Sequence, residues 1–307
     1  MHLLFRLNQR VRRDFHRWRY RHIVEPVLST PPLPRGGQPF TLLSMVQPSD
    51  LASYLMALKS FARMANPQRV VIVCDPAMGK FEMNTLIAHV PHAELRHAGD
   101  FTHPKIPRGG TWERLNAIAA YASEDYVVQL DADTLTSGPV PEVLASIHGG
   151  SGFVAGEQAG QQCVSLPAAA NHARPWLDDP GVPHIIAVAE VALPEVGLPA
   201  QARYVRGCSG FTGFPRAQDM RERLLDFSAR MGDRIGLRWR EWGSEQVASN
   251  YLLANSVRPT VLPFPRYATP DAADGTTVFW HFIGPVRFAN GQYGRLSSML
   301  LPALVGS

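Results

Sequence analysis

Two aspartates that directly follow an apolar segment are the clearest chemical signal in the sequence. Residues 126–130 (YVVQL) have the composition of a buried strand and lead into Asp131-Ala-Asp133. Ligands of open α/β sheets bind beyond the carboxyl ends of the strands, and two neighbouring carboxylates there favour a hard divalent cation. The competing interpretation is a solvent-exposed turn, in which aspartate is also common.

One family with such an aspartate pair can be set aside. The haloacid dehalogenase-type phosphatases begin with an apolar strand followed by D-x-D-x-T/V, and they use a lysine further along the chain. Here Leu135 occupies the fourth position after Asp131, the pair lies in the middle of the chain, and no lysine follows Lys105. The sequence therefore argues against this class of phosphatase.

Further segments place polar and charged residues in an order that can be compared with known families. In chain order they are Trp112-Glu-Arg114-Leu-Asn116, Arg206-Gly-Cys208-Ser209-Gly210-Phe211, Glu245-Gln246-Val-Ala-Ser-Asn250 and His281-Phe-Ile-Gly284-Pro-Val-Arg287. Together with the aspartate pair, these motifs resemble the GT-A glycosyltransferases, in particular the retaining family that includes glycogenin and bacterial lipopolysaccharide galactosyl- and glucosyltransferases. The resemblance covers roughly residues 38–295.

The resemblance implies a metal site and a donor site. The metal would be Mn²⁺ or Mg²⁺, and its implied ligands are Asp131, Asp133 and His281. The residues assigned to binding of the nucleotide-diphosphate sugar are Arg114, the Gly284 backbone, Arg287 and Ser44. Arg287 stands where the family has lysine, which keeps the positive charge and adds a planar fork that fits phosphate oxygens. For His281, the alternative is a hydrogen-bonded core histidine.

The implied catalytic residues are Glu245 and Gln246, placed near the anomeric carbon on the face opposite the leaving group. Glu245 replaces an aspartate of the family, and Cys208 replaces an asparagine, so the acceptor side departs from the family pattern. The alternative is an ordinary helix start, where an acidic residue favours the positive end of the helix dipole. We interpret Trp239, Trp242 and Trp280 as core residues rather than sugar-stacking platforms.

The elements that must position these residues alternate between strands and helices. The sequence predicts strands at 40–46, 69–74, 93–98 and 126–130, and helices at 49–65, 81–89 and 111–123. Later elements are predicted at 141–147, 217–231 and 243–254 (helices) and at 152–155, 260–264 and 277–282 (strands), with long loops between residues 138 and 200. This order predicts an α/β class with a parallel, doubly wound sheet covered on both faces. The resemblance implies a Rossmann-like GT-A domain with a mixed, mostly parallel central sheet.

Composition limits the other properties of the chain. Three cysteines without a C-x-x-C pair, no signal peptide and no membrane-spanning segment among its 307 residues lead us to expect a cytoplasmic protein. Seven arginines lie within residues 1–25, whereas the remaining chain is close to neutral. We divide the chain into a basic extension and linker (1–37) and one domain (38–307), with a nucleotide-sugar half (38–137) and an acceptor half (138–300).

The basic extension has an amphipathic pattern. Apolar residues recur every three to four positions, at Leu3, Leu4, Leu7, Val11, Phe15 and Trp18, with arginines between them. This pattern predicts either a helix on an anionic membrane surface or a helix packed on the domain or a partner. No second basic patch occurs in the body, so we expect no nucleic-acid partner.

The function predicted from these features is metal-dependent transfer of a hexose. The donor would be a UDP-sugar or another nucleotide-diphosphate sugar, and the acceptor a glycan, a lipid-linked sugar or another molecule, with retention implied by the resemblance. Two alternatives remain at this point: a sugar-phosphate nucleotidyltransferase, and a catalytically silent relative that binds nucleotide.

Overall fold

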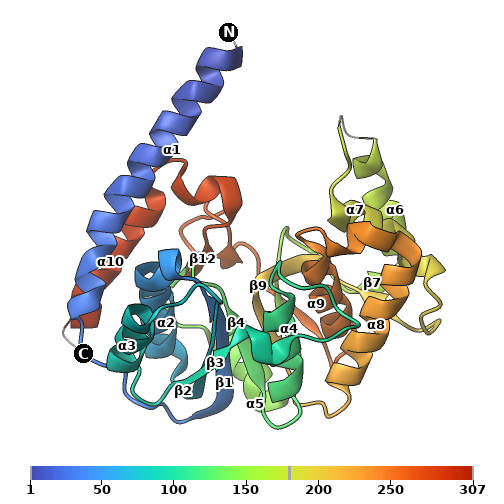
Figure 1. Ribbon diagram of the computed structural model, residues 1–307, viewed down its shortest axis with the longest axis horizontal. Helices are drawn as coiled ribbons and strands as arrows, with labels where there is room; N and C mark the ends of the chain where they lie inside the picture. Colours follow the sequence, from blue (N-terminus) through green and yellow to red (C-terminus); the bar gives the residue numbers. More distant parts are fainter. Residues whose placement is uncertain (1, 179–180, 306–307) are drawn as a thin grey trace.

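A seven-stranded, mostly parallel sheet forms the centre of the molecule (Figure 1). The structure, a computed structural model, describes residues 2–178 and 181–305. In spatial order the strands are β10 (Thr260–Leu262), β6 (Phe153–Gly156), β9 (Gly207–Phe214), β4 (Val127–Leu130), β1 (Gln38–Val46), β2 (Pro67–Cys74) and β3 (Glu94–His97). Within this sheet β9 is antiparallel to β4 and β6, and every other pairing is parallel. The predicted α/β class is confirmed.

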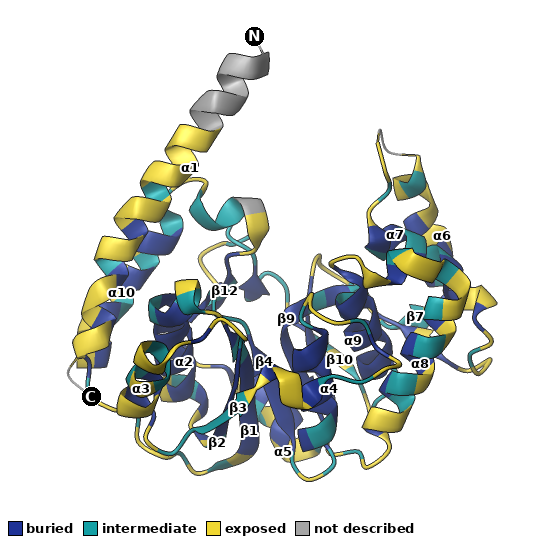
Figure 2. Ribbon diagram, in the orientation of Figure 1, coloured by how far each residue is buried: buried dark blue, intermediate teal, exposed yellow. Residues whose placement is uncertain are grey.

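The central strands are apolar on both faces because helices cover both. Leu42 and Ile72 point into one core, which they share with α2 (Leu51–Ala65), whereas Leu43 and Val71 point into a second core with α4 (Trp112–Tyr121). Figure 2 shows the strands buried and the outer helices exposed on their far sides. This two-sided burial explains why the strands at 40–46 and 69–74 read as continuous apolar runs.

Further helices are α3 (Lys80–His89), α5 (Pro141–Gly149), α6 (Leu166–Ala173), α7 (Ile185–Ala192), α8 (Met220–Ile235), α9 (Ser244–Ala254) and α10 (Gln292–Val305). Of these, α3, α5, α8 and α9 lie close to predicted segments. The loop prediction for residues 138–200 was wrong where α6 and α7 occur, and α10 was not predicted. With eight residues each, α6 and α7 complete barely two turns, which is too short for a helical period to stand out.

Two small sheets complete the structure. One contains β11 (Tyr267–Ala268), β12 (Phe279–His281) and β5 (Thr134–Thr136), and the other contains β7 (Val164–Ser165) and β8 (Arg203–Tyr204). β5 begins directly after the aspartate pair and runs antiparallel to β12, with Thr134 opposite His281. This ladder joins parts of the chain that are far apart in sequence.

The basic extension forms a helix, α1 (His2–Val24), that lies beside α10 (Figure 1). Tyr20 stacks on Tyr293 with 4.1 Å between the ring centroids, and Val27, just after α1, is fully buried. The boundary predicted at residue 37 is therefore not a break in packing. The side chains of Leu3, Leu4 and Leu7, part of the predicted amphipathic pattern, lie outside the described residues.

Among the described residues, no helix combines the length and the apolar character that crossing a bilayer requires.

Candidate functional site

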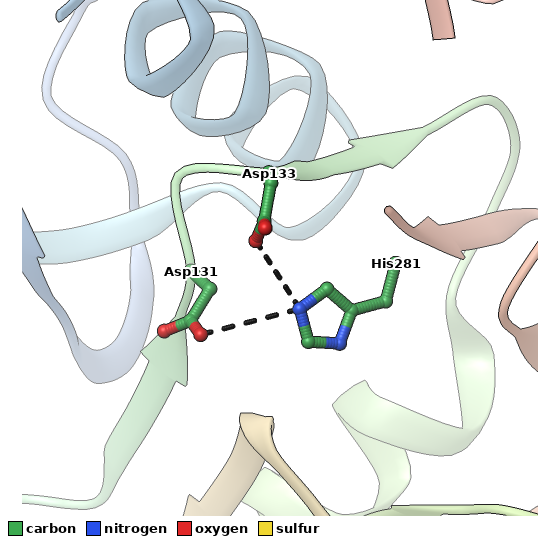
Figure 3. A group of neighbouring side chains, drawn as sticks. All are labelled: Asp131, Asp133 and His281. Carbon is green, nitrogen blue, oxygen red and sulfur yellow. Dashed lines mark hydrogen bonds and ion pairs between the residues drawn. The ribbon is translucent and has the colours of Figure 1, made fainter. Parts of the chain in front are cut away.

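The two aspartates lie at the carboxyl end of β4, in the middle of the main sheet. The Asp131 amide donates to the Gly210 carbonyl of neighbouring β9 at 2.9 Å, which fixes the turn after β4. The chain then enters β5, whose pairing with β12 brings His281 to the same place, and the Phe282 amide donates to the Asp133 carbonyl at 2.9 Å. Two sheets thus hold the three predicted metal ligands together (Figure 3).

The geometry of these three side chains fits a metal ion. His281 Nε2 lies 3.2 Å from Asp133 Oδ1 and 4.0 Å from Asp131 Oδ2. One ligand atom from each residue lies within 4.8 Å of the other two. Two carboxylates and an imidazole are a donor set that fits Mn²⁺, and carboxylates also fit Mg²⁺.

Gly210 makes this close approach possible. A Cβ atom at residue 210 would lie 2.1 Å from His281 Cε1 and 2.9 Å from Asp131 Oδ2. Any side chain on β9 at this point would displace a predicted ligand. The glycine of the Ser209-Gly210 motif therefore leaves the space in which the three ligands meet.

The charges around the three ligands are closely coupled. Burial raises the pKa of Asp131 above its usual value, more than the Arg114 guanidinium lowers it. For Asp133, burial is outweighed by His281 and Arg287, so its pKa is lowered. Burial is likewise outweighed at His281, where Cys208 and Asp133 raise the pKa well above the usual value. The pocket of carboxylates therefore stabilises positive charge.

Arg114 lies beneath the metal ligands and connects them to Glu245. Its guanidinium is buried, pairs with Asp131, and lies 3.3 Å from Glu245 Oε1. A hydrogen bond of 3.0 Å from Trp112 Nε1 to Ser244 Oγ joins α4 to α9 and holds the two residues in this position. Glu245 also accepts from Thr111 Oγ1 at 3.0 Å.

Arg287 approaches the site from the segment that follows β12. Its Nη2 donates to Asp50 Oδ1 at 2.9 Å and to Ser53 Oγ at 3.0 Å, and its Nη1 lies 3.9 Å from Asp133 Oδ2. Gly284 is exposed, with a positive φ of 45°, and a Cβ there would meet no atom within 4 Å. Its backbone is open to a ligand. Asp50 and Ser53 were missed because no sequence pattern connects them to Arg287.

A cavity of about 730 Å³ opens beside these residues, along the carboxyl ends of the strands. It is lined by the ends of β1, β2 and β3 and by Arg114, Asp131, Asp133 and Arg287. A volume of this size is typical of sites for small ligands and cofactors. Two of the predicted metal ligands, Asp131 and Asp133, lie in its wall.

Four other predicted residues occupy different environments. Ser44 is fully buried, and its hydroxyl donates to the Leu130 carbonyl at 2.7 Å, which fixes β1 to β4 beneath the site. The Gln246 side chain is half-buried and donates to the Gly207 carbonyl at 3.1 Å. Trp242 is 70% exposed and lines the cavity, so its prediction as a core residue was wrong, whereas Trp239 is buried as predicted.

Comparison with known proteins identifies the fold through structure rather than sequence. No protein-family model matches the sequence, and no curated protein matches it either. The apo structure of WbbM, a bifunctional glycosyltransferase, is similar with a TM-score of 0.52 and 14% identity, over 90% of this chain and 53% of WbbM. This chain therefore spans about half the length of WbbM.

The structure of LgtC resembles the chain over nearly its whole length. An active-site mutant of LgtC gives a TM-score of 0.52 and 11% identity, over 86% of this chain and 96% of LgtC. Another crystal structure shows the galactosyltransferase LgtC in complex with donor and acceptor sugar analogues. From this likeness and the sheet topology, we conclude that the chain has the GT-A fold of glycosyltransferases.

Proposed function

We propose that the protein is a metal-dependent glycosyltransferase that takes a hexose from a nucleotide-diphosphate sugar, UDP-hexose being the donor that we expect. The observation that carries the proposal is the convergence of Asp131, Asp133 and His281, of which the two aspartates line the strand-end cavity. A divalent cation held by these residues would neutralise charge that develops on the leaving diphosphate. LgtC, which shares the fold, has been crystallised with donor and acceptor sugar analogues. This supports our proposal that the present protein binds a sugar donor and a sugar acceptor.

The chain's own residues suggest how the donor would lie. Arg287 and the open Gly284 backbone would hold the phosphates, because both line the space around Asp133. The nucleotide would occupy the part of the cavity over β1, β2 and β3. The sugar would then point towards Arg114, whose guanidinium Asp131 and Glu245 hold in place.

Glu245 and Gln246 would have different roles in this arrangement. Glu245 is surrounded by Arg114, Thr111 and Ser209, so it would act by holding Arg114 in position. The Gln246 amide group is more accessible and would lie near the anomeric carbon, where its oxygen can stabilise positive charge. We propose retention of the anomeric configuration on the family resemblance described above.

The acceptor is proposed to be at a membrane surface. Val11, Phe15 and Trp18 on α1 are exposed by 60%, 53% and 58%. Their spacing places them on one side of the helix, about opposite Tyr20, which packs on α10. Arginines flank this apolar stripe, which is typical of helices that lie in an anionic interface. We propose that α1 holds the enzyme peripherally on such a membrane.

Substitution of one metal ligand tests the proposed function. Asp133→Asn keeps the size of the side chain but removes the charge, and it should abolish Mn²⁺-dependent hydrolysis or transfer of UDP-hexose, measured by release of UDP. The matched control is Asp271→Asn, an exposed aspartate in another loop, which should leave the rate unchanged.

Three results would contradict the proposal. Full activity of the Asp133→Asn variant would show that the metal site is wrong. Pyrophosphate release from UTP and a hexose phosphate, without use of UDP-hexose, would show a nucleotidyltransferase. Thermal stabilisation by UDP and Mn²⁺ without turnover of any nucleotide sugar would show a silent relative.

A further inference from the structure

A second cavity of about 730 Å³ lies between α1 and the body of the protein. It adjoins the strand-end cavity, because Asp50, Asp133 and Arg287 line both. Its other walls come from α1, from the start of α2 and from the segment around Phe288. A second ligand could therefore reach the metal and phosphate residues from the side of α1.

Positive charge from α1 converges on this cavity. Arg13, Arg17 and Arg21 lie one helical turn apart and all line it. Arg13 and Arg17 share a distant partner, Asp14, at 3.9 Å each, and Arg21 forms no ion pair with any residue that the structure describes. Of the carboxylates that line the cavity, Asp50 and Asp133 lie near Arg287, and Glu25 follows α1. The three guanidinium groups therefore give the α1 side of the cavity a net positive charge.

The Phe288 ring shows how closely α1 approaches the segment that carries Arg287. The Arg17 guanidinium carbon lies 5.5 Å from the centroid of the Phe288 ring, and that of Arg287 lies 5.3 Å from the same centroid. Two cations from opposite ends of the chain thus contact a single side chain. The arginines of α1 and the proposed donor-phosphate residue Arg287 therefore meet at Phe288.

The cavity also has an apolar side and unused hydrogen-bonding groups. Tyr20, Val24 and Phe288 contribute its apolar lining. The Tyr20 hydroxyl is buried and, like Arg287 Nε, makes no hydrogen bond of normal length to the described residues. Burial raises the pKa of Tyr20 to about 12, so the hydroxyl keeps its proton and can donate. These two buried groups lie behind the cavity wall, so the donors that the cavity presents next to its apolar lining are the guanidinium groups of the α1 arginines.

We propose that this cavity binds the phosphate end of an amphipathic acceptor, a lipid phosphate monoester. Arg17 and Arg21 hold the phosphate, and the first part of the hydrocarbon chain packs against Tyr20 and Phe288. The exposed stripe of α1 brings the cavity to the membrane in which such a lipid lies. This inference names the acceptor class of the proposed glycosyltransferase and therefore rests on the proposed function. Binding of the lipid phosphate can nevertheless be measured without turnover.

Calorimetric titration of the full chain with farnesyl phosphate, below its micelle concentration, tests the inference. Arg17→Gln/Arg21→Gln should weaken binding about tenfold or more, because charge-assisted hydrogen bonds are lost. The matched control is Arg10→Gln/Arg12→Gln, which removes the same charge from α1 outside the cavity and should change the affinity by about twofold at most. Farnesol and hexose 1-phosphate should each bind about tenfold more weakly than farnesyl phosphate, because each lacks one half of the ligand. Saturating UDP with Mn²⁺ should leave the lipid phosphate bound.

Several results would overturn the inference. Equal weakening by the control pair would show general attraction to a basic helix. Equal binding of hexose 1-phosphate would show a site for soluble phosphates, and complete displacement by UDP would show that the ligand occupies the donor site. None of these results bears on whether UDP-hexose is hydrolysed, so the proposed function would be tested separately.

Discussion

His281 is held from both of its ring nitrogens. Nε2 faces Asp133, and Nδ1 lies 2.9 Å from Cys208 Sγ on β9. A contact at the second nitrogen fixes the ring orientation of a metal-binding histidine and leaves the first nitrogen for the ion. Cys208, which departs from the family asparagine, thus still lies where it can position the histidine.

Gly210→Ala should weaken metal binding without unfolding the protein. The new Cβ would overlap His281 Cε1 and approach Asp131 Oδ2, so both ligands must move. We expect Mn²⁺ affinity to fall about tenfold or more, as for loss of a metal-orienting contact, measured by electron paramagnetic resonance of free Mn²⁺. Gly275→Ala, where a Cβ meets nothing within 4 Å, is the control. Unchanged Mn²⁺ affinity in Gly210→Ala would argue against the site.

The sequence predicted the metal ligands better than their surroundings. Asp131, Asp133 and His281 were predicted together because motifs in a fixed order carry a family resemblance. The partners of Arg287 were not predicted, because Asp50 lies 237 residues from Arg287 and only tertiary folding brings the two residues together. Trp242 was assigned to the core because the sequence does not distinguish a buried tryptophan from one that lines a cavity.

At the scale of elements, α1 has one face that packs on the protein and one that is exposed. Its inner face packs on α10, and its outer face carries Val11, Phe15 and Trp18. The sequence left membrane binding and protein packing as alternatives, and the structure shows that one face of α1 packs on the protein. The predicted apolar pattern identified Val11, Phe15 and Trp18 but not the residues of α1 that contact α10.

Phe15→Ser/Trp18→Ser should weaken binding to vesicles that contain anionic lipid. Two large apolar side chains are removed from the exposed stripe, and each contributes about 1 kcal/mol or more when it leaves water, so partition should fall about tenfold or more. Cosedimentation with vesicles measures this. Leu237→Ser, which removes a 78% exposed leucine elsewhere, should have no effect. Equal vesicle binding by all three proteins would show that α1 serves another purpose.

Lys59 connects the segment after α1 to α2. Its Nζ donates to Thr30 Oγ1 and to the Pro31 carbonyl, each at 2.6 Å. Lys59→Met leaves both acceptors unpaired and should lower the free energy of unfolding by about 1–3 kcal/mol, measured by urea denaturation. Lys105→Met, at an exposed position, is the control and should change little.

The same pair of proteins should show a pH dependence with a defined sign. Burial lowers the pKa of Lys59 to about 8, from 10.5 for the free side chain. Between these values the unfolded chain binds a proton that the folded chain has released, so the wild-type free energy of unfolding rises with pH relative to Lys59→Met. A stability difference that shrinks between pH 8 and pH 10 would contradict the lowered pKa.

For the whole molecule, the predicted mostly parallel sheet was confirmed because apolar runs and their alternation with helices are local signals. The contact between the two ends of the chain was not predicted, since α10 was missed and pairing between α1 and α10 has no local signature. Tyr20 and Val24 of α1 and Tyr293 of α10 belong to one core cluster. The extension is therefore part of the folded domain.

Deletion of residues 1–30 should destabilise the whole protein. It removes the buried side chains of Tyr20, Val24 and Val27 and exposes the surface of α10 that they cover. Loss of three core residues should lower the thermal midpoint by about 10 °C or more, measured by calorimetry. Phe15→Ser/Trp18→Ser changes only exposed residues and should keep the wild-type midpoint. An unchanged midpoint after deletion would show that α1 is dispensable for folding.

The pairing of α1 with α10 also sets an order of events during synthesis. α1 leaves the ribosome before the helix that covers its inner face, which is made about 270 residues later, roughly 15 to 55 s at typical elongation rates. During that interval the inner face of α1 lacks the partner that covers it in the folded protein. A chaperone, or the membrane on which we propose that α1 lies, would cover this face until α10 is made.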